Sequence, residues 1–329
     1  MRALFRSIVH ALEAGQPVQL VSILASSGST PRGAGAVLAV FPDGSSAGTI
    51  GGGNVEYEAV RLASALLRSG ENGLRDFRFA PGEDLGMACG GQATLHFHHL
   101  SPGDGSTAAL LRRLLASSGE NRDQWLVRRL EGAQVLETLL ADRDTPELPP
   151  GLLEHRAVFR EGWFSLPAVR AGLVYIFGGG HVSQALVPLL AAAGFRPAVW
   201  DDRPEFVSPD RFPQAERLFC GPFEEVSSRL SVTADDDVVI MTRGHQADYT
   251  VLAQLLRSGA RYLGCIGSRR KLALCRERLL AEGFTEEEYR RLHAPIGLNI
   301  GAETPAEIAV SVAAELIAVR AGVEPGPWV

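Results

Sequence analysis

The stretch LVYIFGGGHVSQAL, residues 173–186, reads as an apolar strand, a glycine turn and the start of a helix. Gly178, Gly180 and Ser183 occupy the small-residue places of a G-x-G-x-x-G pattern. In that pattern the first glycine permits a tight turn, and the second lets a phosphate approach the helix N-terminus. The stretch therefore predicts the first strand, turn and helix of a Rossmann-like sheet.

An acidic pair, Asp201 and Asp202, ends the next predicted strand. The pair follows the glycine turn by about 20 residues, where dinucleotide-binding folds place the carboxylate that binds the ribose. Two interpretations stay open. The crevice holds a nucleotide or NAD(P), or the fold is inherited and its crevice is empty or repurposed.

The region around this stretch, residues 172–329, alternates apolar strand-like runs with helical patterns. Such alternation predicts a parallel, doubly wound sheet. Near the end of the chain, Thr304, Pro305 and Glu307 have the spacing of a helix N-cap, its first residue and the third position of a capping box. We therefore expect the last helix to begin at Pro305.

Two polar loops follow predicted strands of this sheet. His245 and Asp248 lie where a dehydrogenase needs a proton-transfer residue, so they would act as an acid and the carboxylate that orients it. The alternative is that His245 only bonds a loop and Asp248 caps the next helix. Residues 268–271, Ser-Arg-Arg-Lys, suit an anion such as a phosphate. They equally suit a solvated helix start.

The first 100 residues mix strand-like and helical patterns. Strands are predicted over residues 18–25, 36–41, 76–80 and 93–100. A helix is predicted over residues 57–70. Glycine-rich loops separate these elements. Their candidate binding residues are Arg32, Gly51, Gly52, Gly53, Asn54, Cys89, Gly90 and Gly91. Bare backbone N–H groups in such loops can hold an anion, although most glycine-rich loops carry no chemistry.

Three histidines, His96, His98 and His99, follow the last of these loops. On a strand, His96 and His98 share one face and His99 points to the other. Because no matching carboxylate or third ligand shares their face, a structural role is favoured over a metal site.

Composition excludes several classes of protein. With 46% hydrophobic and 21% charged residues, the 329-residue chain has material for the cores of two soluble domains. The net charge is −6 and no long basic run occurs, so nucleic-acid binding is not expected. The uncharged run 171–195 is broken by the glycine turn and Pro188, which favours a buried strand and helix over a membrane span.

The chain starts with an amphipathic pattern that lacks the features of a signal peptide. Its four cysteines include no C-x-x-C pair, which makes structural zinc unlikely on spacing grounds. We therefore expect reduced thiols and a cytoplasmic location.

The predicted fold class is α/β. An N-terminal mixed α+β domain is expected over residues 1–100, and a Rossmann-like doubly wound parallel-sheet domain over 172–329. Between them, residues 101–171 are expected to form a helix, a hairpin and a linker that pack with the N-terminal domain.

Motifs along nearly the whole chain resemble the XdhC/CoxI family, the accessory proteins of xanthine dehydrogenase and related molybdenum hydroxylases. The matching stretches are GSTPRGAGAVLAV, GTIGGGNVE and GMACGG, followed by FGGGHVSQAL, VWDDRPEF, MTRGHQADYTVL, GCIGSRRK and PIGLNIGAETPAEIAVSVAAEL. So many ordered matches are more specific than any single glycine motif.

The resemblance implies a chaperone that binds molybdenum cofactor, a pterin dithiolene with a phosphate. It would protect the cofactor while a cysteine desulfurase replaces an oxo ligand with sulfur, and then deliver it to an apo xanthine dehydrogenase-type hydroxylase. The family's cofactor-binding cysteine falls on Cys89, whose thiolate suits molybdenum or its sulfur. Gly90 and Gly91 would leave room for the cofactor.

The resemblance leaves open whether the cofactor is bound in its mononucleotide or its cytosine dinucleotide form. It also leaves open whether the chain forms a homodimer. A chaperone is favoured over a catalyst. The alternative is an NAD(P)-dependent oxidoreductase that uses Asp201, His245 and Asp248.

This chain departs from the family pattern at two positions. Arg243 stands where relatives often carry a second histidine, which puts a paired-histidine role in doubt. Asn54 stands where some relatives carry a cysteine, so Cys89 is the one plausible cofactor thiol of the first domain.

Overall fold

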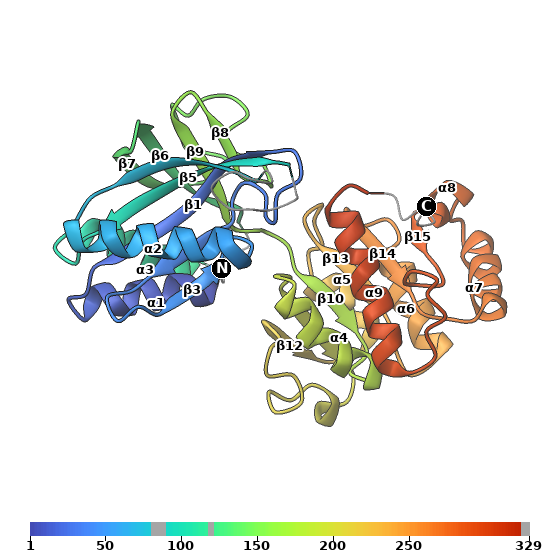
Figure 1. Cartoon of the computed structure of the whole chain (residues 1–329). Coiled ribbons are helices and arrows are strands. Elements are labelled where there is room, and N and C mark those ends of the chain that lie inside the picture. The colour runs from blue at the N-terminus through green and yellow to red at the C-terminus, as the bar shows by residue number, and fades with distance from the viewer. Residues whose placement is uncertain (80–89, 118–121, 324–329) are drawn as a thin grey trace. The chain divides into compact units, whose positions relative to one another are not determined.

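The computed structural model describes residues 1–79, 90–117 and 122–323 of the chain. The chain forms two compact units, Met1–Arg170 and Ala171–Val329 (Figure 1). Among the described helices, none has the length and apolar character needed to cross a membrane.

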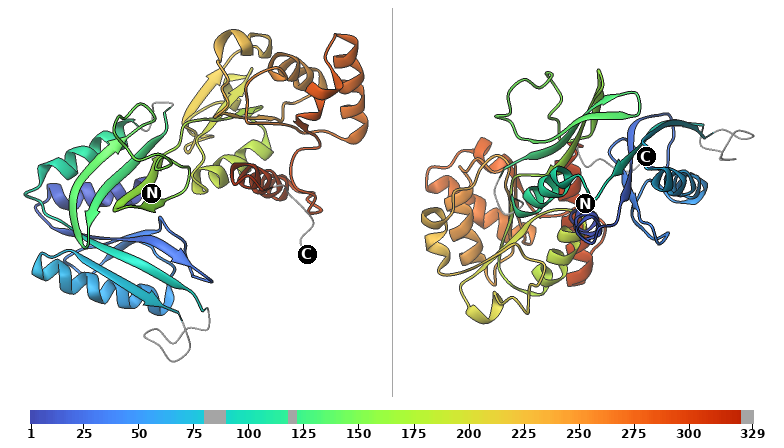
Figure 2. Two further views of the ribbon diagram at one scale, coloured as in Figure 1. Left: turned by 90° about the horizontal axis from the view of Figure 1, so that it is seen from above. Right: turned by 90° about the vertical axis from the view of Figure 1, so that its left-hand side faces the viewer.

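The first unit is built on an antiparallel five-stranded sheet in the order β3-β2-β1-β5-β4. Its strands are β1 (Val18–Ser27), β2 (Val37–Val40), β3 (Ser46–Thr49), β4 (Gly73–Arg78) and β5 (Gln92–Leu100). Side chains alternate along β1. Val21 and Ile23 pack with α2 (Gly53–Ser69) on one face, while Leu20 and Leu24 pack on the other face with α1 (Arg2–Glu13) and α3 (Gly105–Ser117). The left view of Figure 2 shows these helices on opposite sides of the sheet.

A second antiparallel sheet, in the order β7-β6-β9-β8, completes this unit. Its strands are β6 (Gln124–Glu131), β7 (Gln134–Ala141), β8 (Val158–Arg160) and β9 (Trp163–Val169). Leu126, Leu130, Phe164 and Leu166 of this sheet belong to the same core cluster as α1 and α3. The hairpin expected within residues 101–171 is β6 and β7, whereas β3, β8 and β9 have no predicted counterpart, because these runs are short or, in β9, contain a proline.

The second unit contains a parallel six-stranded sheet in the order β12-β11-β10-β13-β14-β15. Its strands are β10 (Val174–Phe177), β11 (Pro197–Asp201), β12 (Arg217–Cys220), β13 (Asp237–Ile240), β14 (Tyr262–Cys265) and β15 (Leu292–His293). This is the doubly wound order in which ligands bind where the strand order reverses, between β10 and β13. The predicted α/β fold class, with its Rossmann-like second half, is confirmed.

Helices cover both faces of the parallel sheet (Figure 1). α4 (His181–Ala192) and α9 (Pro305–Arg320) pack on one face, and α6 (His245–Leu255) and α7 (Arg269–Ala281) on the other. The remaining helices are the short α5 (Val226–Arg229) and α8 (Glu286–Arg290) and the 3-10 turns η1 (Pro204–Phe206) and η2 (Phe223–Glu225). The predicted start of the last helix is confirmed: Thr304 and Glu307 form the reciprocal bonds of a capping box.

Candidate functional site

The glycine-rich loops of the first unit meet at one end of its sheet. β1 and β5 pair as far as Ser27 opposite Gln92, so the loop after β1 meets the segment before β5. There Ser29 forms a β-bridge with Gly90, and a Cβ on Gly91 would lie 2.4 Å from the Ser29 carbonyl oxygen. The structure therefore brings Gly90 and Gly91 against the loop after β1. Cys89, the residue before them, lies outside the described residues.

The loop before α2 reaches the same region. A Cβ on Gly51 would lie 2.6 Å from the Pro31 side chain, so only glycine fits there without a shift. Gly51, Gly52 and Gly53 have positive φ angles of 133°, 73° and 61°, which glycine adopts at little cost. Around Gly52 and Gly53 an added Cβ would meet nothing within 4 Å. The backbone of this turn is therefore open on one side.

Part of this predicted anion cradle is occupied by Glu56, a residue of α2. Its Oε2 accepts hydrogen bonds from Ile50 N at 3.0 Å, Gly52 N at 3.1 Å and Thr49 Oγ1 at 2.5 Å. Burial opposes the charged form, but these bonds hold the pKa of Glu56 below its ordinary value. An external anion would therefore have to approach the exposed Gly53 and Asn54, rather than the amides that Glu56 already binds.

Arg32 supplies a cation beside these loops. Its side chain is exposed, and the backbone N–H of Arg32 lies near Gly51. Within residues 1–79, 90–117 and 122–323, no ion pair holds its guanidinium. The first unit thus brings together an open glycine turn, the bare backbone of Gly90 and one accessible cation.

The histidines of β5 belong to a buried polar cluster between the two sheets of the first unit. Arg128 is 1% exposed and donates from Nη2 to Ser22 Oγ at 2.7 Å. Its Nη1 lies 3.4 Å from His96 Nδ1, and His96 Nε2 lies 2.9 Å from the Ala133 carbonyl oxygen. Because a guanidinium can only donate, Nδ1 of His96 accepts and Nε2 carries the proton.

This cluster holds its histidines neutral. Burial, aided by the charge of Arg128, lowers the pKa of His96 to about 4 and that of His98 to about 2. The two rings share a face, with centroids 6.0 Å apart, as the strand pattern predicted. In the part of the chain that the structure describes, no group of three or more His, Cys, Asp or Glu side chains suits a metal ion.

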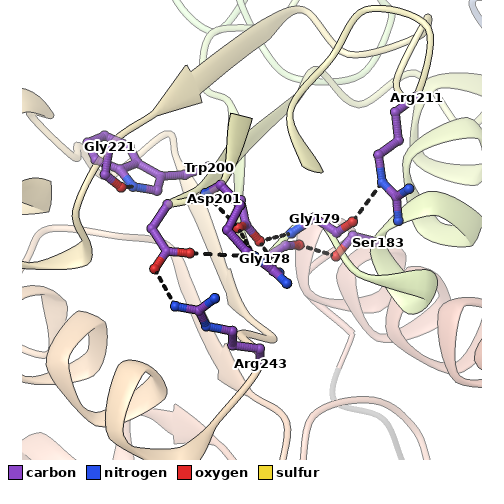
Figure 3. A network of polar contacts seen from close by, with 10 residues as sticks. Gly178, Gly179, Ser183, Trp200, Asp201, Arg211, Gly221 and Arg243 are labelled. Atoms are coloured by element: carbon purple, nitrogen blue, oxygen red, sulfur yellow. Dashed lines mark hydrogen bonds and ion pairs between the residues drawn. The ribbon is translucent and has the colours of Figure 1, made fainter. Parts of the chain in front are cut away.

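In the second unit, each small residue of the glycine turn has its own environment. Gly178 has φ 106°, and a Cβ there would lie 2.2 Å from the Met241 carbonyl oxygen of the neighbouring strand. Around Gly180 an added Cβ would meet nothing within 4 Å. Ser183 is buried and donates from Oγ to the Gly178 carbonyl oxygen at 2.5 Å (Figure 3). The turn therefore packs tightly at its start and is open at the N-terminus of α4.

Asp201 has no bonding capacity left for a ribose. It is 1% exposed, and its Oδ2 accepts from Gly179 N at 2.8 Å and from Arg203 Nη2 at 3.1 Å. Its Oδ1 accepts from Arg203 N at 3.1 Å and Arg203 Nε at 2.9 Å. A carboxylate has about four acceptor sites, so these bonds use them all. Asp201 therefore stabilises the glycine turn through its hydrogen bond from Gly179 N.

Asp202 instead pairs across the crevice. Its Oδ2 lies 2.8 Å from Arg243 Nη2, so the pair links the residue after β11 to the loop after β13. Arg243 is therefore part of the site.

Residues after Asp202 cover the outer side of the glycine turn, which sequence reasoning missed. Arg211 donates from Nε to the Gly179 carbonyl oxygen at 3.0 Å, and a Cβ on Gly179 would lie 2.1 Å from the Phe206 carbonyl oxygen. The guanidinium carbons of Arg203 and Arg211 lie 3.5 Å and 4.7 Å from the centre of the Phe206 ring. In the sequence, only Arg203, directly after the acidic pair, pointed to this covering of the glycine turn.

His245 and Asp248 both lie in the first turn of α6 but share no hydrogen bond among the described groups. His245 is exposed at the first residue of α6. Asp248 Oδ1 accepts from Thr242 N at 2.9 Å and Thr242 Oγ1 at 2.6 Å, and burial raises the pKa of Asp248. Asp248 thus braces the loop after β13. The basic side chains of residues 269–271 are exposed at the start of α7.

Comparison with known proteins gives similarity over both units. Residues 174–316 match the description XdhC Rossmann domain, and residues 11–78 match XdhC and CoxI family. The chain is 30% identical over 320 residues to Uncharacterized protein YqeB of Escherichia coli (strain K12), covering 96% of this chain and 46% of that protein. It therefore spans about half the length of that relative.

A second relative and a solved structure are similar along most of their length. Molybdenum cofactor insertion chaperone PaoD of Escherichia coli (strain K12) is 28% identical over 322 residues, which cover 97% of this chain and 88% of that protein. The crystal structure of a xanthine dehydrogenase (BH1974) from Bacillus halodurans superposes with a TM-score of 0.78 at 25% identity, covering 98% of both chains. With matches in its first unit and in its Rossmann unit, the chain belongs to the XdhC and CoxI family.

Proposed function

We propose that this protein is a molybdenum-cofactor insertion chaperone for a xanthine dehydrogenase-type hydroxylase. The observation that supports this most directly is the meeting of the loops at Gly28–Gly33, Gly51–Gly53 and Gly90–Gly91, next to Cys89 in the sequence. The similarity to a protein named molybdenum cofactor insertion chaperone supports the same function.

The residues present fit a bulky anionic cargo. Backbone without side chains at Gly52, Gly53 and Gly90 leaves space, since a Cβ at any of them would meet nothing within 4 Å. Arg32 supplies a cation for the phosphate of the cofactor. In this proposal the thiolate of Cys89 contacts molybdenum or its sulfur ligand, which a soft ligand suits. The molybdenum and its dithiolene supply the redox chemistry only after delivery to the hydroxylase.

The proposed partners are a cysteine desulfurase, which would supply the sulfur, and the apo-hydroxylase that receives the cofactor. A chaperone in this role binds its cargo reversibly and keeps water and oxygen from it. Loading and release of the cargo need an accessible binding surface rather than a buried active site, which agrees with the open loops of the first unit.

Replacing Cys89 tests the proposal. We expect Cys89→Ala to bind molybdenum cofactor more weakly by at least the roughly 10–100-fold that loss of an outer-shell partner costs at metal sites. Binding is measured by anaerobic ultrafiltration with cofactor released from a molybdenum enzyme. Cys220→Ala is the control, because Cys220 is an exposed free thiol of the second unit. Equal binding by both variants would move the contact away from Cys89, and no binding by the wild-type protein would refute the function.

A nucleotide in the Rossmann crevice is a second candidate, which the open backbone at Gly180 favours. A cytosine dinucleotide form of the cofactor would bring such a nucleotide. An NAD(P)-dependent oxidoreductase has less support, because Asp201 is saturated and His245 is not hydrogen-bonded to Asp248.

The substitution Gly180→Leu tests whether the Rossmann crevice binds a nucleotide. Gly180 has φ −73°, so a side chain is tolerated there and enters the open space before α4. At a nucleotide concentration about tenfold above Kd, we expect the wild-type melting temperature to rise by about 3 °C and that of the variant to stay unchanged. Differential scanning fluorimetry with cytidine and adenine nucleotides measures the shift. Absence of a wild-type shift with any of them would exclude the nucleotide site.

A further inference from the structure

Tyr57 stands on the outer face of α2, one turn beyond the open glycine loop. Its side chain is 68% exposed, the largest fraction among the exposed large hydrophobic residues of the described chain. Single exposed aromatic residues are common, so exposure alone does not define a site. The position of Tyr57 relative to the glycine loop is what gives it a function.

Tyr57 follows Gly53 by four residues, so the two residues are neighbours on one face of the helix. Side chains of a helix lean toward its N-terminus and cover the preceding turn. Tyr57 therefore stands on the same helix face as Gly53, whose missing side chain leaves open space: no atom lies within 4 Å of where a Gly53 Cβ would be. The opposite face of α2 is packed through Val55 and Ala59, so the ring has no place in the core.

The surroundings of the ring suit a flat, anionic ligand. Gly52 and Gly53 leave open space beside Tyr57, and Gly51 contacts the loop that carries the exposed Arg32. An aromatic ring binds a flat heterocycle by stacking, and a guanidinium binds a phosphate. The glycine loop connects the two groups: it leads directly into α2, which carries Tyr57, and its Gly51 approaches Pro31 and the backbone N of Arg32.

We propose that Tyr57 is a binding residue that stacks on the pterin ring of the cofactor, with the phosphate directed toward Arg32. This inference rests on the proposed function, because it assigns part of the same cargo to a residue of the same surface. It differs from the Cys89 contact in kind: the thiolate meets the metal end of the cofactor, and Tyr57 meets its organic end.

The test measures the affinity of three variants for cofactor released anaerobically from a molybdenum enzyme. We expect Tyr57→Ala to bind about tenfold to a hundredfold more weakly than wild type, the range that loss of a stacking aromatic gives at nucleobase sites. Tyr57→Phe keeps the ring and should bind within about twofold of wild type. Leu136→Ala is the matched control, because Leu136 is an exposed apolar residue of β7 in the same unit.

Each outcome has a separate meaning. Weak binding by Tyr57→Ala, with binding retained by Tyr57→Phe and an unchanged melting temperature, supports stacking. Wild-type affinity in Tyr57→Ala overturns the stacking inference and leaves the chaperone function standing. Equal losses in Tyr57→Ala and Tyr57→Phe would also overturn it, since the hydroxyl and not the ring would then carry the effect. No binding by the wild-type protein overturns the proposed function and this inference together.

Discussion

Gly178→Ala is expected to destabilise the second unit by about 3–5 kcal/mol. This estimate adds the cost of a left-handed backbone conformation for alanine to the cost of a steric clash in a packed core. Gly178 has φ 106°, and a Cβ there would lie 2.2 Å from the carbonyl oxygen of Met241. The clash is with backbone, so no side chain can turn away to relieve it. β10 and β13 would have to separate at the point where they pair.

Gly180→Ala is the matched control for this prediction. It lies in the same turn, has φ −73°, and its Cβ would meet nothing within 4 Å. Because glycine is a better helix N-cap than alanine, the expected loss is about 1 kcal/mol, well below that of Gly178→Ala. Urea unfolding followed by circular dichroism compares the two variants. Similar losses in both would show that the close approach at Gly178 does not govern the stability of the unit.

Stability of the first unit is expected to fall as the pH drops from about 7.5 to 5, by about 2 kcal/mol from His96 alone. Burial, with the charge of Arg128, lowers the pKa of His96 from its ordinary 6.5 to about 4 in the folded protein. Above pH 6.5 the ring is neutral in both states, so it contributes no pH dependence. Between pH 6.5 and 4 the unfolded chain takes up a proton that the folded chain cannot accept, and the free energy of unfolding decreases.

His96→Gln isolates this contribution. A glutamine amide can donate to the Ala133 carbonyl oxygen, and its oxygen can accept from Arg128, but it does not titrate. The variant should be less stable than wild type at pH 7.5 and should lose about 2 kcal/mol less on going to pH 5. Urea unfolding at both pH values, followed by the fluorescence of the buried Trp125, gives the two differences. Equal pH dependence in the two proteins would mean that the pKa of His96 is the same in the folded and unfolded states.

Much of the fold was accessible from local sequence patterns, for a physical reason. A strand, a glycine turn and a helix each depend on residues close together in the chain, so LVYIFGGGHVSQAL predicted the start of the parallel sheet and Thr304 with Glu307 predicted the start of α9. β15 has no predicted counterpart because two residues are too few to show a pattern, and β12 has none because it is an edge strand in which no residue is fully buried.

The candidate site was less accessible, because its chemistry depends on pairs distant in sequence. The glycine turn and the acidic pair predicted a ribose-binding carboxylate, but Asp201 binds Gly179 N across 22 positions and is saturated. In the same way, burial and the nearby guanidinium of Arg128, 32 positions away in the sequence, lower the pKa of His96 and keep it neutral.

By itself, then, the sequence determined the alternation of elements, the glycine turns and the class of fold, since these follow from backbone conformation and apolar periodicity over a few residues. Only the tertiary structure decided which polar groups are already bonded and which surfaces are open. Glu56 binds part of the glycine loop that the sequence offered to an anion, while Gly53 and Tyr57 next to it are exposed. The reason is that hydrogen-bond saturation and burial are properties of long-range packing, which no local pattern encodes.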